Sequence, residues 1–509
     1  MTTTKRHLKL NGTWYEECRG TLEMWQGKTP FDKYYKNCNK EFWFYACHTP
    51  VPGYFYEDEK VIFYQDFRTP ERYKEYRDCG LNVLYLQPND GYYGEDFETS
   101  QLKKNLDAAK AGGIDKVIVC DMRIHALSEK REPLIGEDKQ FKTYQELVNY
   151  VKECIKPYKD YENGLVIGLM LVDEPIRCQL PQAALMFKVV REVWPEAYID
   201  ECLLPLDASF KGMNGVKDEF LSFEDAYADY IDDFLSWSEG KYFSIDSYPL
   251  RGNATKDGGY LEYILPSHFY GLQLLNRICK AHGARFYGMS NSCELAPSLD
   301  RKDPSLRAPT EDEMYWQNNS YLLFGVKCLQ YYTYWAKTSG NNKGEYHIDG
   351  TCFINRDGTR TEMYYYMKRM HEELQKFAKV MLNFEYKKVN YYIKERMYFS
   401  TNYLHFDETA EDFGNFTAME VCEQRHSCAA VITELQDEKN NQLMYAVMNP
   451  QHPALSRFID NNADITLKFA DKYKFAEVWH NGVRTTVELN RGKIRIEIDA
   501  GHAVYLLPF

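Results

Sequence analysis

A strand-then-helix alternation runs from about residue 42 to residue 381, and it limits the folds open to this chain more than any other feature. Short apolar, aromatic or β-branched runs are each followed by a stretch with helical spacing. The eight predicted strands are Phe42–Cys47, Asn82–Gln87, Lys116–Asp121, Leu165–Val172, Ala197–Cys202, Tyr242–Ser247, Ala284–Ser290 and Lys327–Thr333. Their starts lie 32 to 49 residues apart, as eight β/α units with substantial loops require. The alternation therefore predicts an α/β fold, a (β/α)8 TIM barrel.

Helix-start signals support this reading between the strands. Thr69 and Pro70 place a capping residue and a proline where a helix begins, and Thr143 with Glu146 forms a capping-box pattern. A stretch rich in Met and Tyr, 361–381, supplies the eighth helix. With it the ring of β/α units is complete.

The pattern changes after about residue 385 to short alternating runs separated by turn residues such as Asn481-Gly482 and Arg491-Gly492. Such alternation is typical of antiparallel strands joined by tight turns. We therefore expect three parts: an N-terminal extension packed on the barrel (1–40), a catalytic barrel (41–384) and a smaller all-β sandwich domain (385–509).

Composition excludes several classes of protein and partner. The chain has 509 residues, 44% of them hydrophobic and 27% charged, values typical of a globular protein. Its net charge of −13, without a Lys/Arg-rich block, argues against a nucleic-acid partner. No apolar run is long enough for a membrane span or a secretory signal. We expect no membrane association and a cytoplasmic location. The sequence does not indicate the oligomeric state and leaves a homo-oligomer open.

Motifs for metals and cofactors are also missing from the sequence. The 14 cysteines include no CxxC pair, which fits free thiols in a reducing compartment. No HExxH, calcium-loop, GxGxxG, Walker or GxSxG pattern occurs. The sequence therefore predicts neither a metal site nor a bound cofactor.

Polar and aromatic residues follow the predicted strands, where a β/α barrel places its active site. Carboxylates can bind sugar hydroxyls and transfer protons, and the flat faces of Tyr and Trp suit sugar rings. Aromatic residues make up 15% of the chain. We therefore expect a carbohydrate substrate, bound by Asp173, His48, Asp121, Arg123, Tyr248, Asn291, Tyr334 and Trp335.

The strongest local signal is GLMLVDEP at 168–175, where an apolar strand runs directly into two acids and a proline. Charged groups at the end of a buried strand cost desolvation unless they have partners or a role in chemistry. Either Asp173 or Glu174 could simply bind loop backbone or an arginine. The position at the fourth strand favours a catalytic role for Glu174.

With these residues the chain resembles the clan A glycoside hydrolases, retaining barrel enzymes that include β-galactosidase-like families with C-terminal β domains. The fourth strand of that clan typically ends Asn-Glu-Pro, and this chain reads Asp173-Glu174-Pro175. The resemblance implies that Glu174 is the general acid/base. Asp173 replaces the Asn that normally binds the sugar 2-hydroxyl. The segments 325–335 and 354–374 are similar to the eighth β/α unit of such enzymes.

A second carboxylate is needed to complete the chemistry. Retaining enzymes place it about 5 to 5.5 Å from the first as a nucleophile, and inverting enzymes place it farther away to admit water. The clan carries the nucleophile at the end of the seventh strand, where Glu294 is the nearest acid although it comes late. Asp246, after the sixth strand, is the rival and would suit an inverting site.

The sequence therefore predicts a glycoside hydrolase, an O-glycosyl hydrolase, with Glu174 as acid/base and Glu294 as nucleophile. Asp246 is the alternative second carboxylate. A non-catalytic carbohydrate-binding barrel is the alternative from a different class, motivated by the displaced Glu294. A barrel lyase or isomerase is a third alternative, because one fold supports many chemistries.

Overall fold

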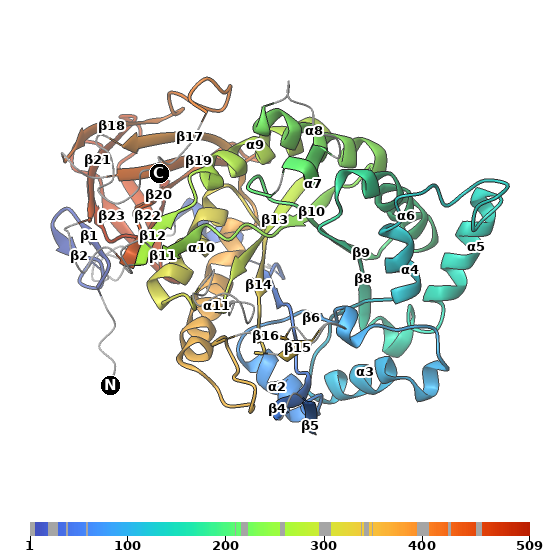
Figure 1. The fold of residues 1–509 in the computed structure, drawn as a ribbon. Helices are drawn as coiled ribbons and strands as arrows, with labels where there is room; N and C mark the ends of the chain where they lie inside the picture. The colour runs from blue at the N-terminus through green and yellow to red at the C-terminus, as the bar shows by residue number, and fades with distance from the viewer. Residues whose placement is uncertain are drawn as a thin grey trace.

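A computed structural model describes residues 6–18, 29–36, 39–57, 60–208, 210–214, 222–254, 260–294, 307–336, 338–340, 346–348, 350–393, 407–425, 429–454 and 461–509. All eight predicted strands are present within it (Figure 1). They are β3 (Trp43–Ala46), β6 (Leu84–Tyr85), β7 (Val117–Val119), β8 (Val166–Asp173), β9 (Tyr198–Leu203), β10 (Tyr242–Ile245), β13 (Arg285–Asn291) and β14 (Cys328–Tyr332). They form one parallel sheet in the order β3-β14-β13-β10-β9-β8-β7-β6. The predicted barrel is confirmed.

A single asparagine joins the first and last strands of this sheet. The Asn82 amide donates to the Phe42 carbonyl (2.8 Å) and accepts from the Phe44 N–H (2.8 Å). The backbone N–H groups of Asn82 and Val83 also donate to the Phe44 carbonyl, at 3.0 and 3.2 Å. Because β6 is short, these bonds replace the ladder that would otherwise close the ring between β3 and β6.

Helices surround the barrel and cover its outer face (Figure 1). They are α2 (Pro70–Asp78), α3 (Gln101–Ala111), α4 (Met122–Ser128), α5 (Tyr144–Ile155), α6 (Leu180–Val193), α7 (Phe210–Asn214), α8 (Phe223–Ser238), α9 (Ser267–His282), α10 (Glu311–Leu323) and α11 (Glu362–Met381). Two predicted starts are confirmed, since α2 begins at Pro70 and the Thr143 side chain caps α5. In the described part of the chain, none of these helices combines the length and apolar composition needed to cross a membrane.

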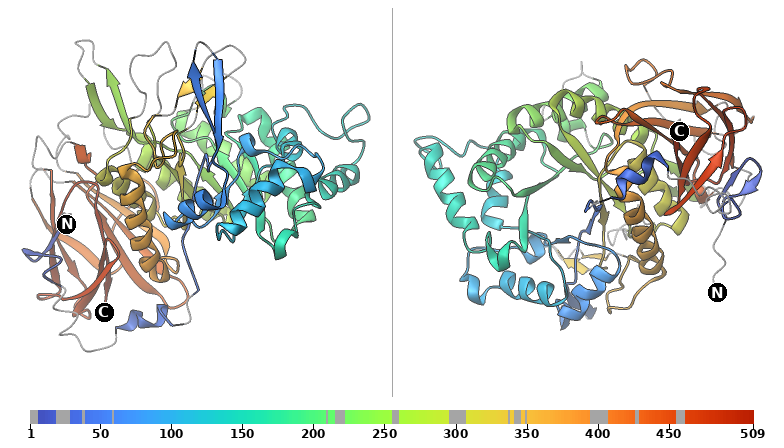
Figure 2. Two further views of the ribbon diagram at one scale, coloured as in Figure 1. Left: turned by 90° about the horizontal axis from the view of Figure 1, so that it is seen from below. Right: turned by 180° about the vertical axis from the view of Figure 1, so that it is seen from behind.

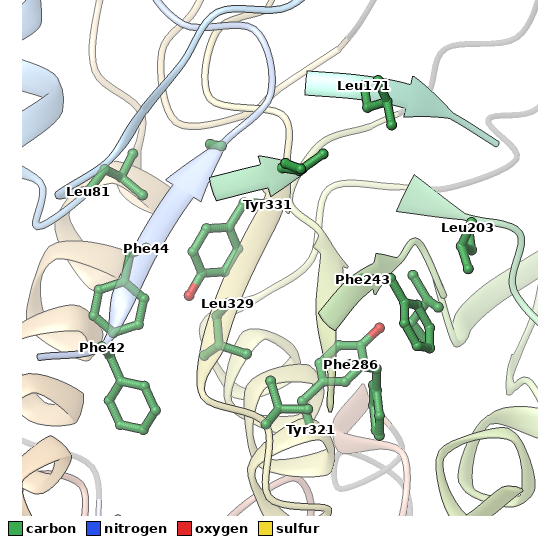
Figure 3. Packing of buried hydrophobic residues seen from close by; sticks show 14 of the residues in the cluster. Phe42, Phe44, Leu81, Leu171, Leu203, Phe243, Phe286, Tyr321, Leu329 and Tyr331 are labelled. Atoms are coloured by element: carbon green, nitrogen blue, oxygen red, sulfur yellow. The ribbon is translucent and has the colours of Figure 1, made fainter. Parts of the chain in front are cut away.

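Side chains of the barrel strands alternate between two separate cores. Outward residues such as Phe44, Phe243 and Phe286 pack against the helices, as Figure 3 shows. Inward residues fill the barrel itself, chiefly Tyr45, Tyr85, Ile118, Met170, Cys202, Met289 and Cys328. The barrel is therefore a packed core, and only its ends can hold a site.

The C-terminal part is a sandwich of two antiparallel sheets around its own core, as predicted. One sheet contains β17 (Glu385–Ile393), β19 (Ala429–Asp437), β20 (Gln442–Met448), β25 (Ala503–Pro508), β22 (Phe475–His480) and β23 (Val483–Glu488). The other contains β18 (Met419–Gln424), β21 (Ala463–Phe469), β24 (Lys493–Ile498), β1 (Leu8–Leu10) and β2 (Thr13–Trp14).

The expected packing of the N-terminal extension on the barrel is wrong for β1 and β2. Leu8 pairs with Ile498 and Leu10 with Ile496, so β1 adds to the sandwich at β24. Both leucines point into the sandwich core, and the pairing covers a sheet edge that would otherwise expose its backbone groups. The domain boundary at 384/385 stays a prediction, although β17 begins at Glu385.

Three hairpins extend the loops that follow β3, β10 and β14. They are β4 (Pro52–Glu57) with β5 (Lys60–Asp66), β11 (Leu250–Ala254) with β12 (Tyr260–Ile264), and β15 (Thr338–Gly340) with β16 (Tyr346–Ile348). All three project from the same end of the barrel in the left view of Figure 2. This is the end at which the strands terminate, so the hairpins surround the expected active site.

Candidate active site

Glu174 directly follows β8 and has a left-handed backbone conformation, with φ of +45°. Its N–H donates to the carbonyl of Cys202 on β9 at 2.8 Å, which holds the turn against the neighbouring strand. His48, after β3, has a φ of +52°. Residues with a Cβ are rarely stable there, and such strain concentrates at functional sites. Glu174 and His48 share this conformation with seven other described residues that are not glycine, and they are the two predicted site residues that adopt it.

A β-bulge in β8 sets the direction of the residues that precede Glu174. Met170 pairs with Asp200 and Val172 with Glu201, so Leu171 is an extra residue in β8. Its carbonyl accepts a hydrogen bond from Ser128 Oγ (2.5 Å) and lies 3.0 Å from His125 Nδ1. Bulges near active sites re-aim side chains. The α4 residues His125 and Ser128 therefore support the turn that presents Asp173 and Glu174.

Glu174 and Asp246 meet across the mouth of the barrel, from the ends of β8 and β10. Desolvation, a side-chain hydrogen bond with Glu174, and the charges of Glu174 and Asp173 raise the pKa of Asp246 well above its ordinary value. Two carboxyl groups this close cannot both ionise easily, which favours the protonated form of Asp246 beside Glu174.

Oδ1 of Asp246 is buried and has no hydrogen-bond partner among the described residues. Buried polar atoms are nearly always hydrogen-bonded, and exceptions call for a ligand, a water or a functional role. This oxygen is therefore a ready acceptor for a substrate hydroxyl.

Asp173 adds a third carboxyl group to the cluster. It keeps exposed surface, yet desolvation by the surrounding protein and the charges of Glu174, Asp200 and Glu129 raise its pKa to about 7. The carboxyl therefore titrates near neutral pH. Asp173, Glu174 and Asp246 form one electrostatically coupled group, and we call it the carboxyl cluster.

The rings of Tyr248, Tyr332 and His48 form a row that begins beside the carboxyl cluster. The charge of Asp246 is among the causes that raise the pKa of Tyr248, after burial. The Tyr248 ring lies 6.1 Å from that of Tyr332, and the Tyr332 ring lies 5.4 Å from that of His48. The structure thus brings the predicted residues Tyr248 and His48 toward the cluster. Tyr332, the last residue of β14, joins them.

Sequence reasoning missed the residues that anchor the chain around Glu174. The hydroxyl of Tyr230 on α8 donates to the Pro175 carbonyl at 2.6 Å. Asp207 pairs with Arg251 at 3.0 Å, and the charge of Glu174 is one of the causes that raise the pKa of Asp207. No local motif marks these side chains, because Asp207 and Tyr230 come from separate parts of the segment between β9 and β10, and Arg251 comes from the hairpin after β10.

Asp121 and Arg123 have structural partners, contrary to the expectation that they bind substrate. Asp121 caps α4 and is fully buried. It accepts hydrogen bonds from Arg123 Nη2 (2.6 Å) and Nε (2.9 Å) and from the Tyr158 hydroxyl (3.2 Å). Arg123 also donates to the Cys154 carbonyl at 2.7 Å. Because these charges satisfy each other, we now interpret the pair as structural.

Asn291 and Glu294 lie at the end of β13 and have other neighbours. Asn291 Oδ1 accepts from the N–H of Cys293 at 3.4 Å. The Glu294 N–H donates to the Thr351 carbonyl at 3.0 Å, and its side chain packs against Gly350, where a Cβ would lie 2.5 Å from Oε2. The charges that act on Asp173 come from Glu174, Asp200 and Glu129. The strongest charge effect on Asp246 also comes from Glu174, and the role of Glu294 stays a prediction.

Tyr334 and Trp335 do not form the expected sugar platform. Both are fully buried. The Trp335 ring packs 4.8 Å from Phe67, and the Tyr334 ring lies 4.9 Å from Tyr76 on α2. The chain turns inward after β14, so these rings belong to the core between barrel and helices. A substrate cannot reach them.

Groups of side chains able to hold a metal ion occur twice among the described residues. One contains His7, Asp312 and His502, and the other contains Glu262, Glu313 and His452. Neither includes a member of the carboxyl cluster.

No protein-family model matches the chain, and no curated protein matches it. Solved structures do match. One is the β-galactosidase of the psychrophilic Marinomonas ef1 (11% identity, 63% of this chain, TM-score 0.39), of whose length this chain spans 60%. Another is the GH39 enzyme of Xanthomonas axonopodis pv. citri (8% identity, 86% and 89% coverage, TM-score 0.39). A third is xylanase 10B of Thermotoga petrophila RKU-1 (15% identity, 69% and 99% coverage, TM-score 0.37).

The three matched proteins are a β-galactosidase, a GH39 enzyme and a xylanase. Similarity at these identities and scores assigns neither a substrate nor a mechanism to this chain. What the present structure itself establishes is an eight-stranded parallel barrel with a C-terminal sandwich.

Proposed function

We propose that this protein is a glycoside hydrolase that uses Glu174 and Asp246 as its carboxylate pair. The observation that carries the proposal is the contact between these two carboxyl groups at the C-terminal end of the barrel. Glycosidases need one carboxylic acid and one carboxylate beside the scissile bond. Two neighbouring carboxyl groups that cannot both ionise easily are suited to supply both.

Glu174 is the general acid/base in this proposal. It protonates the leaving glycosidic oxygen and later removes a proton from the attacking water. The role comes from the resemblance of Asp173-Glu174-Pro175 to the clan A motif, and the backbone strain at Glu174 supports it. The bulge at Leu171, the Tyr230 bond to Pro175 and the Cys202 carbonyl fix the position of Glu174.

Asp246 is the nucleophile in this proposal, in place of Glu294. The hydrogen bond between the two carboxyl groups leaves no room for the water that an inverting separation of about 6.5 to 9.5 Å admits. A substrate that enters between the two groups separates them and leaves the proton on Glu174. The carboxylate of Asp246 then attacks the anomeric carbon while Glu174 protonates the leaving oxygen, and water, deprotonated by Glu174, later hydrolyses the glycosyl-enzyme ester.

Azide rescue on activated aryl glycosides tests the assignment. The wild-type chain is assayed on a panel of sugars together with Glu174→Gln, Asp246→Asn and Glu294→Gln. We expect Asp246→Asn to lose activity and regain it with azide, giving a glycosyl azide of inverted configuration. Rescue of Glu294→Gln with unimpaired Asp246→Asn would return the nucleophile to Glu294.

The same panel separates the other classes of function. Inversion of configuration in the wild-type product would indicate an inverting enzyme. Absence of turnover on every sugar, together with saturable sugar binding in calorimetry, would favour the carbohydrate-binding barrel. Both outcomes contradict the proposal, and folding of each variant is checked by circular dichroism.

A further inference from the structure

We propose that Tyr93 is a stacking platform for a second sugar ring, so that the substrate is an oligosaccharide. The inference rests on the proposed glycosidase function and names the class of its substrate. Tyr93 follows β6 and is 66% exposed, the largest value among the large hydrophobic side chains that the structure describes. An aromatic face that stays open to solvent at a barrel mouth can bind the flat face of a sugar ring.

The side chain of Tyr93 is directed toward the inner side of the barrel mouth. The preceding residue, Tyr92, forms a parallel bridge with Asp121. Its N–H donates to the Cys120 carbonyl (2.9 Å), and its carbonyl accepts from the Met122 N–H (2.9 Å). The Tyr92 ring packs in the outer core, and Met122 packs against the inner core. Because successive side chains of an extended segment point to opposite faces, Tyr93 shares the inner side with Met122.

The loop that carries Tyr93 is held in one conformation by its own contacts. The Tyr93 N–H donates to Glu95 Oε2 (3.0 Å), and the Tyr92 hydroxyl donates to the Glu95 carbonyl (2.7 Å). Gly94 has a φ of +91°, and a Cβ there would lie 2.9 Å from Cδ of Arg123. The Arg123 guanidinium in turn packs over the Tyr92 ring. A platform that is already fixed loses little conformational entropy when a sugar binds to it.

The other exposed large hydrophobic side chains in the described ranges lie elsewhere on the molecule. They are Tyr144 on α5, Phe223 and Trp237 on α8, and Tyr365 on α11, with exposed fractions of 37 to 50%. These helices cover the outside of the barrel (Figure 1). Single exposed hydrophobic side chains on such surfaces are ordinary and need no ligand. Tyr93 differs because it follows a barrel strand, at the end where the carboxyl cluster lies.

The position of β6 in the sheet separates Tyr93 from the carboxyl cluster by a short distance. Only β7 lies between β6 and β8. Neighbouring strands are about 4.8 Å apart, so the ends of β6 and β8 are on the order of 10 Å apart. In the proposed function, the sugar at the cleaved bond lies beside Glu174 and Asp246. We therefore place at Tyr93 a neighbouring ring of the same glycan.

The row of Tyr248, Tyr332 and His48 approaches β6 from the other side of the mouth. The His48 N–H donates to Gln87 Oε1 at 3.0 Å, and Gln87 follows β6. In the order of the sheet, the row runs from the end of β10 past β14 to β3. Rings thus accompany the mouth from the carboxyl cluster toward Tyr93, which suits a substrate of more than one sugar.

Kinetics on substrates of two lengths test the inference. Cello-, xylo-, manno- and galacto-oligosaccharides are compared with the glycosyl fluorides of the same sugars, whose leaving group is too small to reach Tyr93. We expect Tyr93→Ala to raise KM for the cleaved oligosaccharide about tenfold and to change its kcat, and both constants for the fluoride, less than twofold. Tyr93→Phe keeps the ring face and should restore KM. Tyr365→Ala is the matched control, because it removes an exposed tyrosine from α11.

Three results would overturn the inference. They are an unchanged KM for the oligosaccharide in Tyr93→Ala, an equal change for oligosaccharide and fluoride, and oligosaccharides that are neither cleaved nor bound. Failure of the proposed function is a separate result, namely no hydrolysis of any glycoside. Calorimetry with the same oligosaccharides on wild type and Tyr93→Ala then tests the platform alone, and equal affinities would contradict it. Circular dichroism confirms that each variant is folded.

Discussion

Two neighbouring strands of the barrel end in acids that have opposite surroundings. After β7, Asp121 is fully buried, caps α4 and pairs with Arg123 at 2.6 Å. After β8, Asp173 and Glu174 face Asp246, and the pKa values of Asp173 and Asp246 are raised. One strand end gathers opposite charges, and the other gathers like charges.

This difference shows how to separate structural from functional acids at strand ends. A carboxylate whose lone pairs are filled by an arginine, a tyrosine and a helix N-terminus stabilises the fold and has nothing left to offer a substrate. A cluster of like charges destabilises the fold and persists only where something else requires it. Position at a strand end alone predicted a functional role both for Asp121 and for Asp173 and Glu174, and so did not distinguish them.

Replacing Glu174 should give the largest effect on activity. Glu174→Gln removes the proposed acid/base, and kcat on glycosides with poor leaving groups should fall about 10²- to 10⁴-fold. Activated leaving groups need less protonation and should lose less. Asp121→Asn is the matched control from the neighbouring strand end, and its kcat per folded molecule should stay near wild type. Equal losses in both variants would remove the distinction between the two strand ends.

Replacing Asp121 should give the largest effect on stability. Asp121→Asn leaves the Arg123 guanidinium without its anionic partner, at a cost of about 3 kcal/mol in the free energy of unfolding. Urea unfolding followed by tryptophan fluorescence measures the loss. Asp138→Asn, at an exposed position, serves as the control. A change below about 0.5 kcal/mol would mean that the pair is not a structural one.

Removing the hydroxyl that supports the β8 bulge should have a smaller effect. Ser128→Ala takes one donor from the Leu171 carbonyl while His125 remains, so the free energy of unfolding should fall by about 1 kcal/mol. Because the bulge directs Glu174, kcat should also fall. Ser100→Ala, which removes the cap of α3, should cost similar stability without changing kcat. A wild-type kcat in Ser128→Ala would show that the bulge does not control the position of Glu174.

The smallest effect should come from Asp173 and should have the opposite sign. Its raised pKa of about 7 means that ionisation destabilises the folded state, so stability is lost as the pH rises through about 7. Asp173→Asn should therefore be more stable than wild type at pH 8, by on the order of 1 kcal/mol after solvent screening, and equal to it at pH 4. Thermal unfolding at both pH values measures this. A destabilised variant at pH 8 would show that Asp173 has a favourable partner.

Most of the fold could be predicted because buried strands carry a strong local signal. Every barrel strand lies within two residues of its predicted bounds, since runs such as LVIGLMLV have no other stable surroundings. The place of β1 could not be predicted. Three residues, LKL, carry too little pattern to name a partner, and that partner lies almost at the other end of the sequence.

The site could be predicted only in part, because strand-end position does not tell which way a side chain faces. The strand-end position indicated Asp173, Glu174 and Asp246 as site residues, and the structure places these together. It could not foresee that Asp121 meets Arg123, or that Tyr334 and Trp335 turn into the core. Those outcomes depend on contacts with α2, α4 and the following loops, which no local pattern records.

The pairing of β1 with β24 imposes an order on folding during synthesis. His7 and its neighbour Asp499 are 492 positions apart. At a synthesis rate of about 5 to 20 residues per second, the ribosome needs about half a minute or longer to produce β24 after β1. Until β24 is made, β1 can pair only with β2. The sheet that contains β1 is therefore completed only at the end of synthesis, when the beginning of the chain pairs with its last part.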